Sequence, residues 1–235
     1  MSAEVFHTRL MKRNIRRLIA LICGAGVILA AVLSTVPEEP GAPEIIVASP
    51  EGSALTILQE LPVKGKAPKT GYAREQFGNG WSSVDGCDTR NIILYRDLVE
   101  VTLESECQVQ TGVLQDPYTN TRITFTRNDS SAVQIDHVVA LSDAWQKGAQ
   151  QLTKDQRVQL ANDPLELLAV DGPANMQKSD ADAASWLPEN KQYRCAYIAR
   201  QIAVKKKYML WVTQPEKDAM TNILSRCPAE PLPVK

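Results

Sequence analysis

Apolar residues alternate with polar ones in several short runs of this chain, and a period of two predicts β-strands. Val99, Val101 and Leu103 alternate at the end of one run, and the turn-forming residues 116–120 separate it from the next. The predicted strands cover residues 92–103, 123–125, 133–139 and, as a compact apolar run, 165–170.

Capping residues and helical spacing predict helices in the second half of the chain. Thr153 and Gln156 have the form of a capping box and begin a short helix through Leu160. Pro173 suits the first turn of a helix that we expect to reach about Trp186. Two more helices are expected over 193–209 and 215–226. Strand, strand and helix therefore follow one another between 133 and 186, in a chain of α+β class.

The first forty residues have the layout of an export signal. Five Arg and Lys residues lie within 1–17, and an almost wholly apolar run extends from Leu18 to Leu33 before a polar exit. The basic end predicts that everything after Val36 lies outside the cytoplasm. Residues 1–36 are therefore expected to be a signal peptide. Alternatively, because Leu18–Val36 is just long enough to span a bilayer, they are a signal anchor that holds the protein at the membrane.

The remaining length fits one domain. Residues 37–71 are rich in Pro, Gly, Ser, Glu and Lys around a short apolar stretch and predict a flexible tether. An ordered domain is expected over 72–227, with a tail over 228–235. The formal net charge of the chain is −1, which excludes a protein whose whole surface is basic. Binding of a polyanion must then rest on a local patch.

Four cysteines follow the apolar run, and an even number in an exported domain predicts two disulfides. Three pairings are possible. Cys87 with Cys107 and Cys195 with Cys227 is the expected one, because each bridge would close a local segment on one side of the central strands. A four-cysteine zinc site is the alternative, although the chain has no C-x-x-C pair.

The strand predicted over 133–139 carries the candidate chemistry. His137 is one of two histidines, and the other, His7, lies in the export segment, so a histidine general base must be His137. The adjacent Asp136 is a hard oxygen ligand suited to Mg²⁺. Neighbouring residues of a strand face opposite sides, so the two can flank one substrate only where the strand ends or bends.

The helix predicted after Pro173 would complete this site. Asn175 lies in its first turn, and Lys178 shares the same face. A hairpin followed by a helix would bring Asn175 back to Asp136, and the two would hold a metal with open positions for water and phosphate. Each residue also has a structural alternative: a buried hydrogen-bonded histidine, a local cap or ion pair, and a helix-start residue. Their joint spacing favours hydrolysis of phosphodiesters.

Three segments extend the motif: Ile135–Trp145, Asn162–Val170 and Ala174–Lys178. With flanking residues from about 72 to 227 they resemble exported bacterial HNH (ββα-metal) endonucleases, which are related to the C-terminal nuclease domain of GmrSD restriction enzymes. The resemblance implies a ββα-metal hairpin-plus-helix core with additional strands and helices. It also implies that His137 is the general base and that Asp136 and Asn175 hold a divalent metal, Mg²⁺ or alternatively Mn²⁺.

The middle of the motif departs from this family. Glu166 stands directly before a Leu of the second strand, where HNH proteins usually have an Asn that steadies the histidine loop. The Glu166 carboxylate can still accept a hydrogen bond, and Asn162 lies nearby, so both are expected to support catalysis. Ser179 stands where a Gly is common after the Lys. These departures leave reduced activity open.

Contacts to substrate phosphates are expected from basic residues. Lys178 and Arg90 are candidates close to the motif. The stretch 190–215 holds six basic residues and no acidic one, and among these Arg194 and Lys205 are further candidates. The alternative for this stretch is an ordinary solvated helix face.

Three hypotheses follow. The first is a metal-dependent endonuclease acting on DNA, or also on RNA, and either secreted or anchored to the outer face of the bacterial cytoplasmic membrane, with no protein partner inferred. The second is a catalytically weak or inactive envelope-anchored domain that binds nucleic acid or another polyanion, which Glu166 favours. The third is a metal-dependent phosphodiesterase with a substrate other than nucleic acid.

Overall fold

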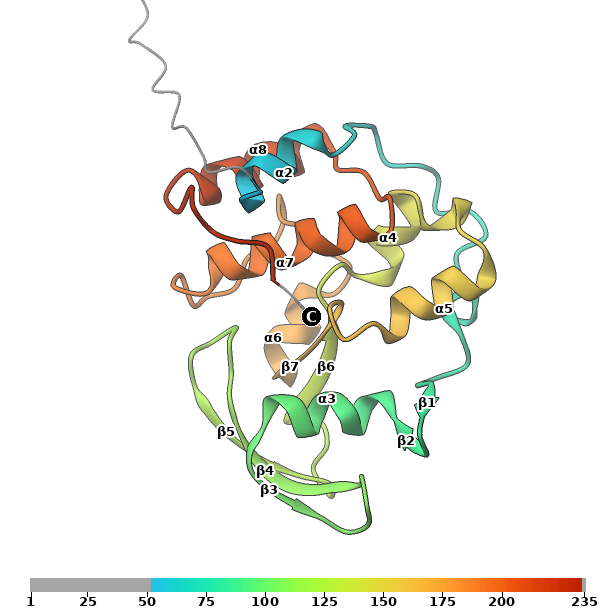
Figure 1. Ribbon diagram of the computed structural model, residues 1–235, viewed down its shortest axis with the longest axis vertical. Coiled ribbons are helices and arrows are strands. Elements are labelled where there is room, and N and C mark those ends of the chain that lie inside the picture. Colours follow the sequence, from blue (N-terminus) through green and yellow to red (C-terminus); the bar gives the residue numbers. More distant parts are fainter. Residues whose placement is uncertain (1–51, 234–235) are drawn as a thin grey trace, which may run out of the picture. The chain divides into compact units, whose positions relative to one another are not determined.

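A computed structural model describes residues 52–233, and the expected signal segment 1–36 lies outside this range. None of the helices in residues 52–233 has the length and apolar character needed to cross a membrane. Helices and small antiparallel sheets make up the described part, which confirms the α+β class (Figure 1). The sheets pair β1 with β2, β3 with β4 and β5, and β6 with β7.

The helices and strands have the following bounds in chain order. The helices are α2 Ala54–Glu60, α3 Thr89–Asp97, α4 Leu141–Gln146, α5 Lys154–Asn162, α6 Gly172–Lys178, α7 Arg194–Lys207 and α8 Gln214–Leu224, with short 3-10 turns η1 Arg74–Phe77 and η2 Ala149–Gln151. The strands are β1 Ser83–Val84, β2 Cys87–Asp88, β3 Val99–Leu103, β4 Val109–Gln115, β5 Arg122–Thr126, β6 Val133–His137 and β7 Leu167–Asp171.

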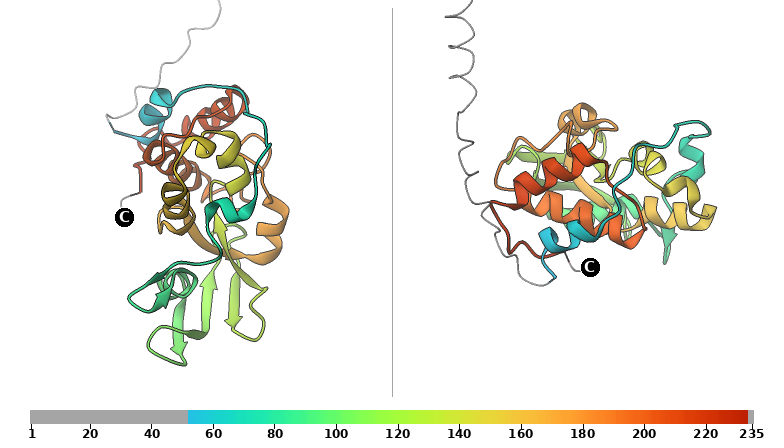
Figure 2. Two further views of the ribbon diagram at one scale, coloured as in Figure 1. Left: turned by 90° about the vertical axis from the view of Figure 1, so that its right-hand side faces the viewer. Right: turned by 90° about the horizontal axis from the view of Figure 1, so that it is seen from above.

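The folded part begins before residue 72, so the expected tether is too long. The side chain of Ser53 caps α2, which buries Ala54, Ile57 and Leu58 in the larger hydrophobic core. The apolar stretch inside the expected spacer is therefore one side of a short helix. Figures 1 and 2 show α2 beside α7 and α8, which pack against it.

The strand predicted over 92–103 is wrong in its first half. Asp88 accepts a hydrogen bond from the backbone N–H of Asn91 and so caps α3, which continues to Asp97 before β3 begins. The cap at Asp88 favours a helix here and outweighs the β-branched residues, which favour a strand. The helix expected from Pro173 to Trp186 ends early as well, because Ser179 adopts a left-handed backbone with a φ of 51°.

The antiparallel pair β6–β7 separates two hydrophobic cores. Ile135 on β6 packs in the smaller core with α3 and the β3–β4–β5 sheet, whereas Leu168 on β7 packs in the larger core with the C-terminal helices. Asp136 lies opposite Leu168 in the pair and His137 lies opposite Leu167. Directly opposite residues share a face of a sheet, so Asp136 and His137 point toward different cores.

Helix α6 follows β7 without a loop and packs on β6 and β7. Gly172 is its first residue, and its backbone N–H donates to the Ala132 carbonyl at 3.0 Å. A Cβ at this position would lie 2.0 Å from the backbone oxygen of Ser131. Only glycine allows the helix to approach the start of β6 this closely.

Buried ions and disulfides join the C-terminal helices to the rest of the domain. The Lys147 ammonium, on the residue after α4, contacts Asp143, Asp182 and Glu216 at 2.6–2.8 Å. We call this group, with Lys205 beside Glu216, the lysine–carboxylate cluster. Burial alone would raise the pKa of Asp182, but the hydrogen bond and charge of Lys147 and the charge of Lys66 lower it to about 2.

The two expected disulfides are both present. Cys87 pairs with Cys107 beside the smaller core, and Cys195 pairs with Cys227 across the ends of α7 and α8. The alternative of a four-cysteine zinc site is thereby excluded. The capping box of Thr153 and Gln156 is also confirmed at the start of α5.

Candidate active site

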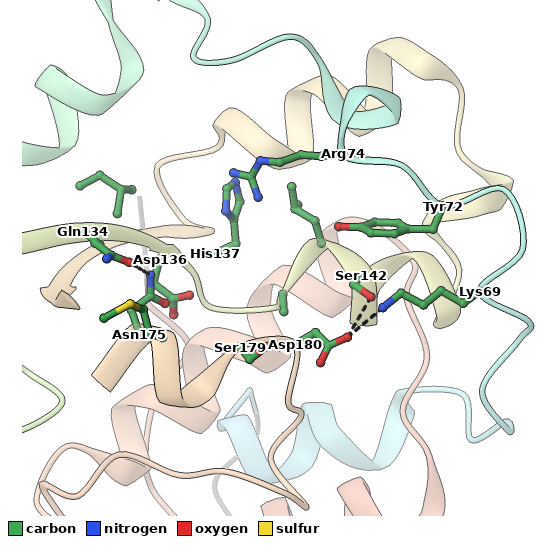
Figure 3. Close-up of a pocket in the computed structure, with 14 residues that line it drawn as sticks. Lys69, Tyr72, Arg74, Gln134, Asp136, His137, Ser142, Asn175, Ser179 and Asp180 are labelled. Carbon is green, nitrogen blue, oxygen red and sulfur yellow. Dashed lines mark hydrogen bonds and ion pairs between the residues drawn. The ribbon is translucent and has the colours of Figure 1, made fainter. Parts of the chain in front are cut away.

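The end of β6 opens into a pocket of about 510 Å³ that both Asp136 and His137 line (Figure 3). Their side chains leave the strand on opposite faces, but β6 ends at His137 and the chain turns toward α4. Adjacent strand residues can face one substrate only where the strand ends, and Asp136 and His137 lie at such an end. The pocket also takes in Asn175 from α6.

His137 is buried and held in a defined orientation. Its Nε2 lies 3.0 Å from the backbone oxygen of Ala161, and its ring stacks on the Trp81 indole with centroids 5.7 Å apart and planes 7° from parallel. A carbonyl oxygen only accepts, so Nε2 carries the hydrogen and the neutral ring keeps its lone pair on Nδ1. Burial, followed by the charge of Arg74, lowers the pKa of His137 to about 3. The ring is therefore neutral at physiological pH.

Asp136 is buried between an ammonium and a phenol. Lys178 Nζ donates to its Oδ1 at 2.9 Å, and the Tyr118 hydroxyl donates to its Oδ2 at 2.5 Å. Burial raises the pKa of Asp136 above its ordinary value, and the charge of Lys178 together with these hydrogen bonds opposes that rise. Each carboxylate oxygen has a second lone-pair site, so both remain able to bind another group.

Asn175 reaches the same side of the hairpin as Asp136. Its side-chain nitrogen donates to Gln134 Oε1 at 2.9 Å, and Gln134 is two residues from Asp136 on one face of β6. Figure 3 shows all three at one end of the pocket. This hydrogen bond leaves the Asn175 carbonyl oxygen without a donor among residues 52–233. One carboxylate, amide oxygens and open space for water fit a single hard divalent ion such as Mg²⁺.

Glu166 and Asn162 act on backbone around the histidine. Glu166 is fully buried, and its Oε2 accepts the N–H of Val139 at 3.2 Å, two residues after His137. Burial raises the pKa of Glu166 well above its usual range, which favours the neutral carboxyl. Asn162 Oδ1 accepts the N–H of Ser82 at 2.8 Å and so fixes the chain beside Trp81. Glu166 therefore holds the backbone of the loop that follows the histidine.

The basic residues expected to contact substrate lie elsewhere or are already paired. Lys178 is buried on Asp136 and on the carbonyl of His137. Lys205 is fully buried against Glu216, so a direct substrate contact does not agree with its placement. Arg194 donates to the Pro188 carbonyl, and Arg90 donates to the carbonyls of Ser130 and Val133. None of the four lines the pocket.

The cations that do line the pocket come from the segment before β1. Lys69 and Arg74 both reach it, and Figure 3 shows the Arg74 guanidinium pointing toward the His137 ring. Arg74 is exposed, and Lys69 is half-exposed with its ammonium 3.0 Å from Asp180. Lys69 falls in the stretch 37–71 that the sequence predicts to be a tether, and no local motif marks either Lys69 or Arg74 as a site residue.

Comparisons with known proteins support the family. Residues 88–223, more than half of the chain, match the C-terminal domain of GmrSD restriction endonucleases. The chain is also 38% identical over 199 residues to an uncharacterized secreted protein of Arthroderma benhamiae, which covers 83% of this chain and 94% of that protein. That relative is fungal, so the family is not confined to the bacterial proteins that the motifs resemble. No solved structure matches the chain. Because the match includes β6, β7 and α6, this protein belongs to the family of GmrSD restriction endonuclease C-terminal domains.

Proposed function

We propose that this protein is a metal-dependent endonuclease that hydrolyses phosphodiester bonds in DNA, or also in RNA, outside the cytoplasm. One observation supports this most directly. A neutral histidine with an unprotonated Nδ1 shares an open pocket with a carboxylate and an amide, each a hard oxygen donor. The unit of β6, β7 and α6 then corresponds to the ββα-metal core of HNH nucleases.

His137 takes the proton from the attacking water in this proposal. The Ala161 carbonyl fixes the tautomer and the Trp81 indole fixes the plane of the ring. The Nδ1 lone pair therefore has one defined direction, and the ring need not rotate before it accepts a proton. A positioned general base contributes about 10²–10⁴-fold to a rate. The remainder must come from stabilisation of charge on the phosphate and on the leaving oxygen.

Asp136 and Asn175 would hold the metal, with Mg²⁺ as the expected ion and Mn²⁺ as a substitute. When bound, such an ion supplies Lewis-acid stabilisation of the phosphate and of the leaving alkoxide. Lys178 keeps Asp136 ionised by placing a positive charge beside it, despite the burial that favours the protonated form. Lys178 is thus a positioning residue in this proposal.

Arg74 and Lys69 would bind the substrate phosphates. Both reach the pocket from the side opposite Asn175, and their charges offset the carboxylates that line it. The rest of the exposed surface needs no basic character, which agrees with a net charge of −1.

Action outside the cytoplasm is supported by two observations. The described domain contains two disulfides, which persist in oxidising compartments. The fungal relative is described as secreted. With the export signal expected over 1–36, these favour a secreted or membrane-anchored protein.

Plasmid cleavage tests the proposal. We expect the purified protein to nick supercoiled plasmid with Mg²⁺ or Mn²⁺ and to lose this activity in EDTA. His137→Ala should lose it at least a hundredfold, and Asn175→Ala should require more metal for half-maximal rate. Tyr95→Ala is the control, because Tyr95 is 61% exposed on α3 and does not line the pocket. Undiminished cleavage by His137→Ala would refute the proposed mechanism.

A second candidate function is binding of nucleic acid without turnover. The ion pair of Lys178 with Asp136 favours it, since the ammonium partly neutralises the only carboxylate that would hold the metal near Asn175. This version predicts that the protein retains an oligonucleotide in EDTA as well as in Mg²⁺ and never cleaves it. Efficient metal-dependent cleavage eliminates it.

A further inference from the structure

A second cavity, of about 210 Å³, adjoins the candidate active site. The two cavities share Arg74, His137 and Leu141, so His137 forms part of the wall of each. The rest of its lining is two aromatic rings, two glycines and one alanine: Phe77, Trp81, Gly78, Gly80 and Ala161. Its volume is smaller than the ~300 Å³ at which drug-sized ligand pockets begin, so it suits one planar ring system.

Two glycines with unusual backbone conformations line this cavity. Gly78 and Gly80 have φ values of +106° and +115°, which L side chains rarely adopt. A Cβ on Gly80 would meet no atom within 4 Å, so the space beside it is free. The positive φ values therefore favour glycine at both positions, and at Gly80 the backbone is left uncovered.

Trp81 presents a fixed aromatic surface to the cavity. One side of its ring system stacks on His137, and the residue is only partly buried. The next residue, Ser82, is tied down at both backbone groups, by Asn162 Oδ1 at 2.8 Å and by the N–H of Thr89 at 2.8 Å. The indole is therefore held in place without filling the cavity.

We propose that this cavity binds one unstacked nucleobase of the substrate, next to the phosphate that is attacked by the water His137 deprotonates. The proposal rests on the nuclease function above and names its substrate class: single-stranded DNA or RNA in preference to duplex. Every base has a flat π-face, so an aromatic wall accepts bases with little sequence preference. Arg74 lies between the two cavities, where its guanidinium can contact both the phosphate and the edge of that base.

The free-energy cost of unstacking a base is higher in a duplex than in a single strand. A base can enter the cavity only after it leaves its stack and its pair, which costs a few kcal/mol in a duplex and much less in a single strand. The open phosphate pocket alone would not impose this difference. Strand preference is therefore the property that separates a base-binding cavity from a solvent-filled one.

The test combines base removal with removal of the indole. We would measure kcat/KM on a single-stranded oligonucleotide, on its duplex and on versions with one abasic nucleotide placed at successive positions. Wild type should cleave the single strand at least tenfold faster than the duplex, and one abasic position should cost about tenfold, the magnitude of base stacking on an aromatic ring. Trp81→Ala should be slower overall and lose the abasic penalty. Trp81→Phe should retain the penalty, and the exposed control Tyr95→Ala should match wild type.

The outcomes separate this proposal from the nuclease function. Equal cleavage of abasic and intact strands at every position, or of duplex and single strand, overturns the base cavity and leaves the nuclease in place. An abasic penalty that persists unchanged in Trp81→Ala also overturns it. If wild type cleaves none of these substrates, the affinity for the same oligonucleotides is measured in EDTA. A loss of affinity at one abasic position, removed by Trp81→Ala, supports the cavity without the nuclease function. Equal affinity for all oligonucleotides overturns both.

Discussion

The Lys178–Asp136 pair gives the sharpest test of how the fold supports the site. The two side chains are 0% and 5% exposed, and Nζ lies 2.9 Å from Oδ1, so this is a buried pair and not a surface one. Lys178→Met keeps most of the side-chain volume but leaves the carboxylate without its counter-ion. Removing one partner of a buried pair costs roughly 3–5 kcal/mol. For a domain of this size we therefore expect the melting temperature to fall by about 6–20 °C.

A double-mutant cycle shows whether the cost comes from the unpaired charge. Asp136→Asn together with Lys178→Met removes both charges, so the double variant should be more stable than Lys178→Met alone. Urea unfolding followed by tryptophan fluorescence in EDTA gives the four free energies. Lys206→Met is the matched surface control, because its ion pair with Glu60 is about half-exposed on both sides and should cost less than about 1 kcal/mol. If Lys178→Met costs no more than Lys206→Met, or if the cycle shows no coupling, the buried pair does not support the site as argued.

Three further predictions concern the helix after β7, the buried ions and the phosphate contacts. Gly172→Ala should cost at least about 1–3 kcal/mol and reduce cleavage by displacing α6, since its Cβ would collide with the backbone oxygen of Ser131; thermal unfolding and plasmid nicking measure the two effects. Asp182 has a pKa lowered from 3.8 to about 2, so it stabilises the fold above about pH 4 and loses this contribution as the pH falls toward 2. The stability difference between wild type and Asp182→Asn should therefore shrink over that interval in urea titrations, and a constant difference would contradict the assignment. Lys69→Ala should raise KM by roughly twofold to fivefold, as suits an exposed charge, whereas Lys206→Ala, of similar exposure and also paired with a carboxylate, should not change KM.

The parts of the fold that the sequence predicts well are those determined by contacts close in the chain. The capping box at Thr153 begins α5 where expected, because both of its hydrogen bonds lie within four residues. The alternation of Val133, Ile135 and His137 likewise gives β6, since one face of the strand packs in the smaller core. The pairing of the cysteines is also local on each side of the central hairpin.

The parts of the fold that the sequence predicts wrongly depend on contacts between residues that are distant in the chain. The apolar residues of α2 are too few to mark a helix alone, and they are buried only because α7 and α8, about 150 residues later, pack against them. The helix after Gly172 stops at Lys178 because the chain must turn there, and composition does not record that turn. Local patterns identified β6, β7 and the start of α6 and could not define what surrounds them.

The same distinction explains why the three candidate site residues are easier to locate from the sequence than the cations that line the pocket. Asp136, His137 and Asn175 lie on elements that are consecutive in the ββα order, so their spacing alone indicates that they meet. Lys178, the basic residue nearest to them in sequence, is expected to bind phosphate, yet burial makes it the counter-ion of Asp136 instead. An ionised carboxylate in a buried position needs such a cation, because burial raises its pKa and a neighbouring ammonium lowers it. In the proposed nuclease the positive charge for the substrate would then come from exposed residues, and exposed Arg74, about sixty residues earlier in the chain, lines the pocket.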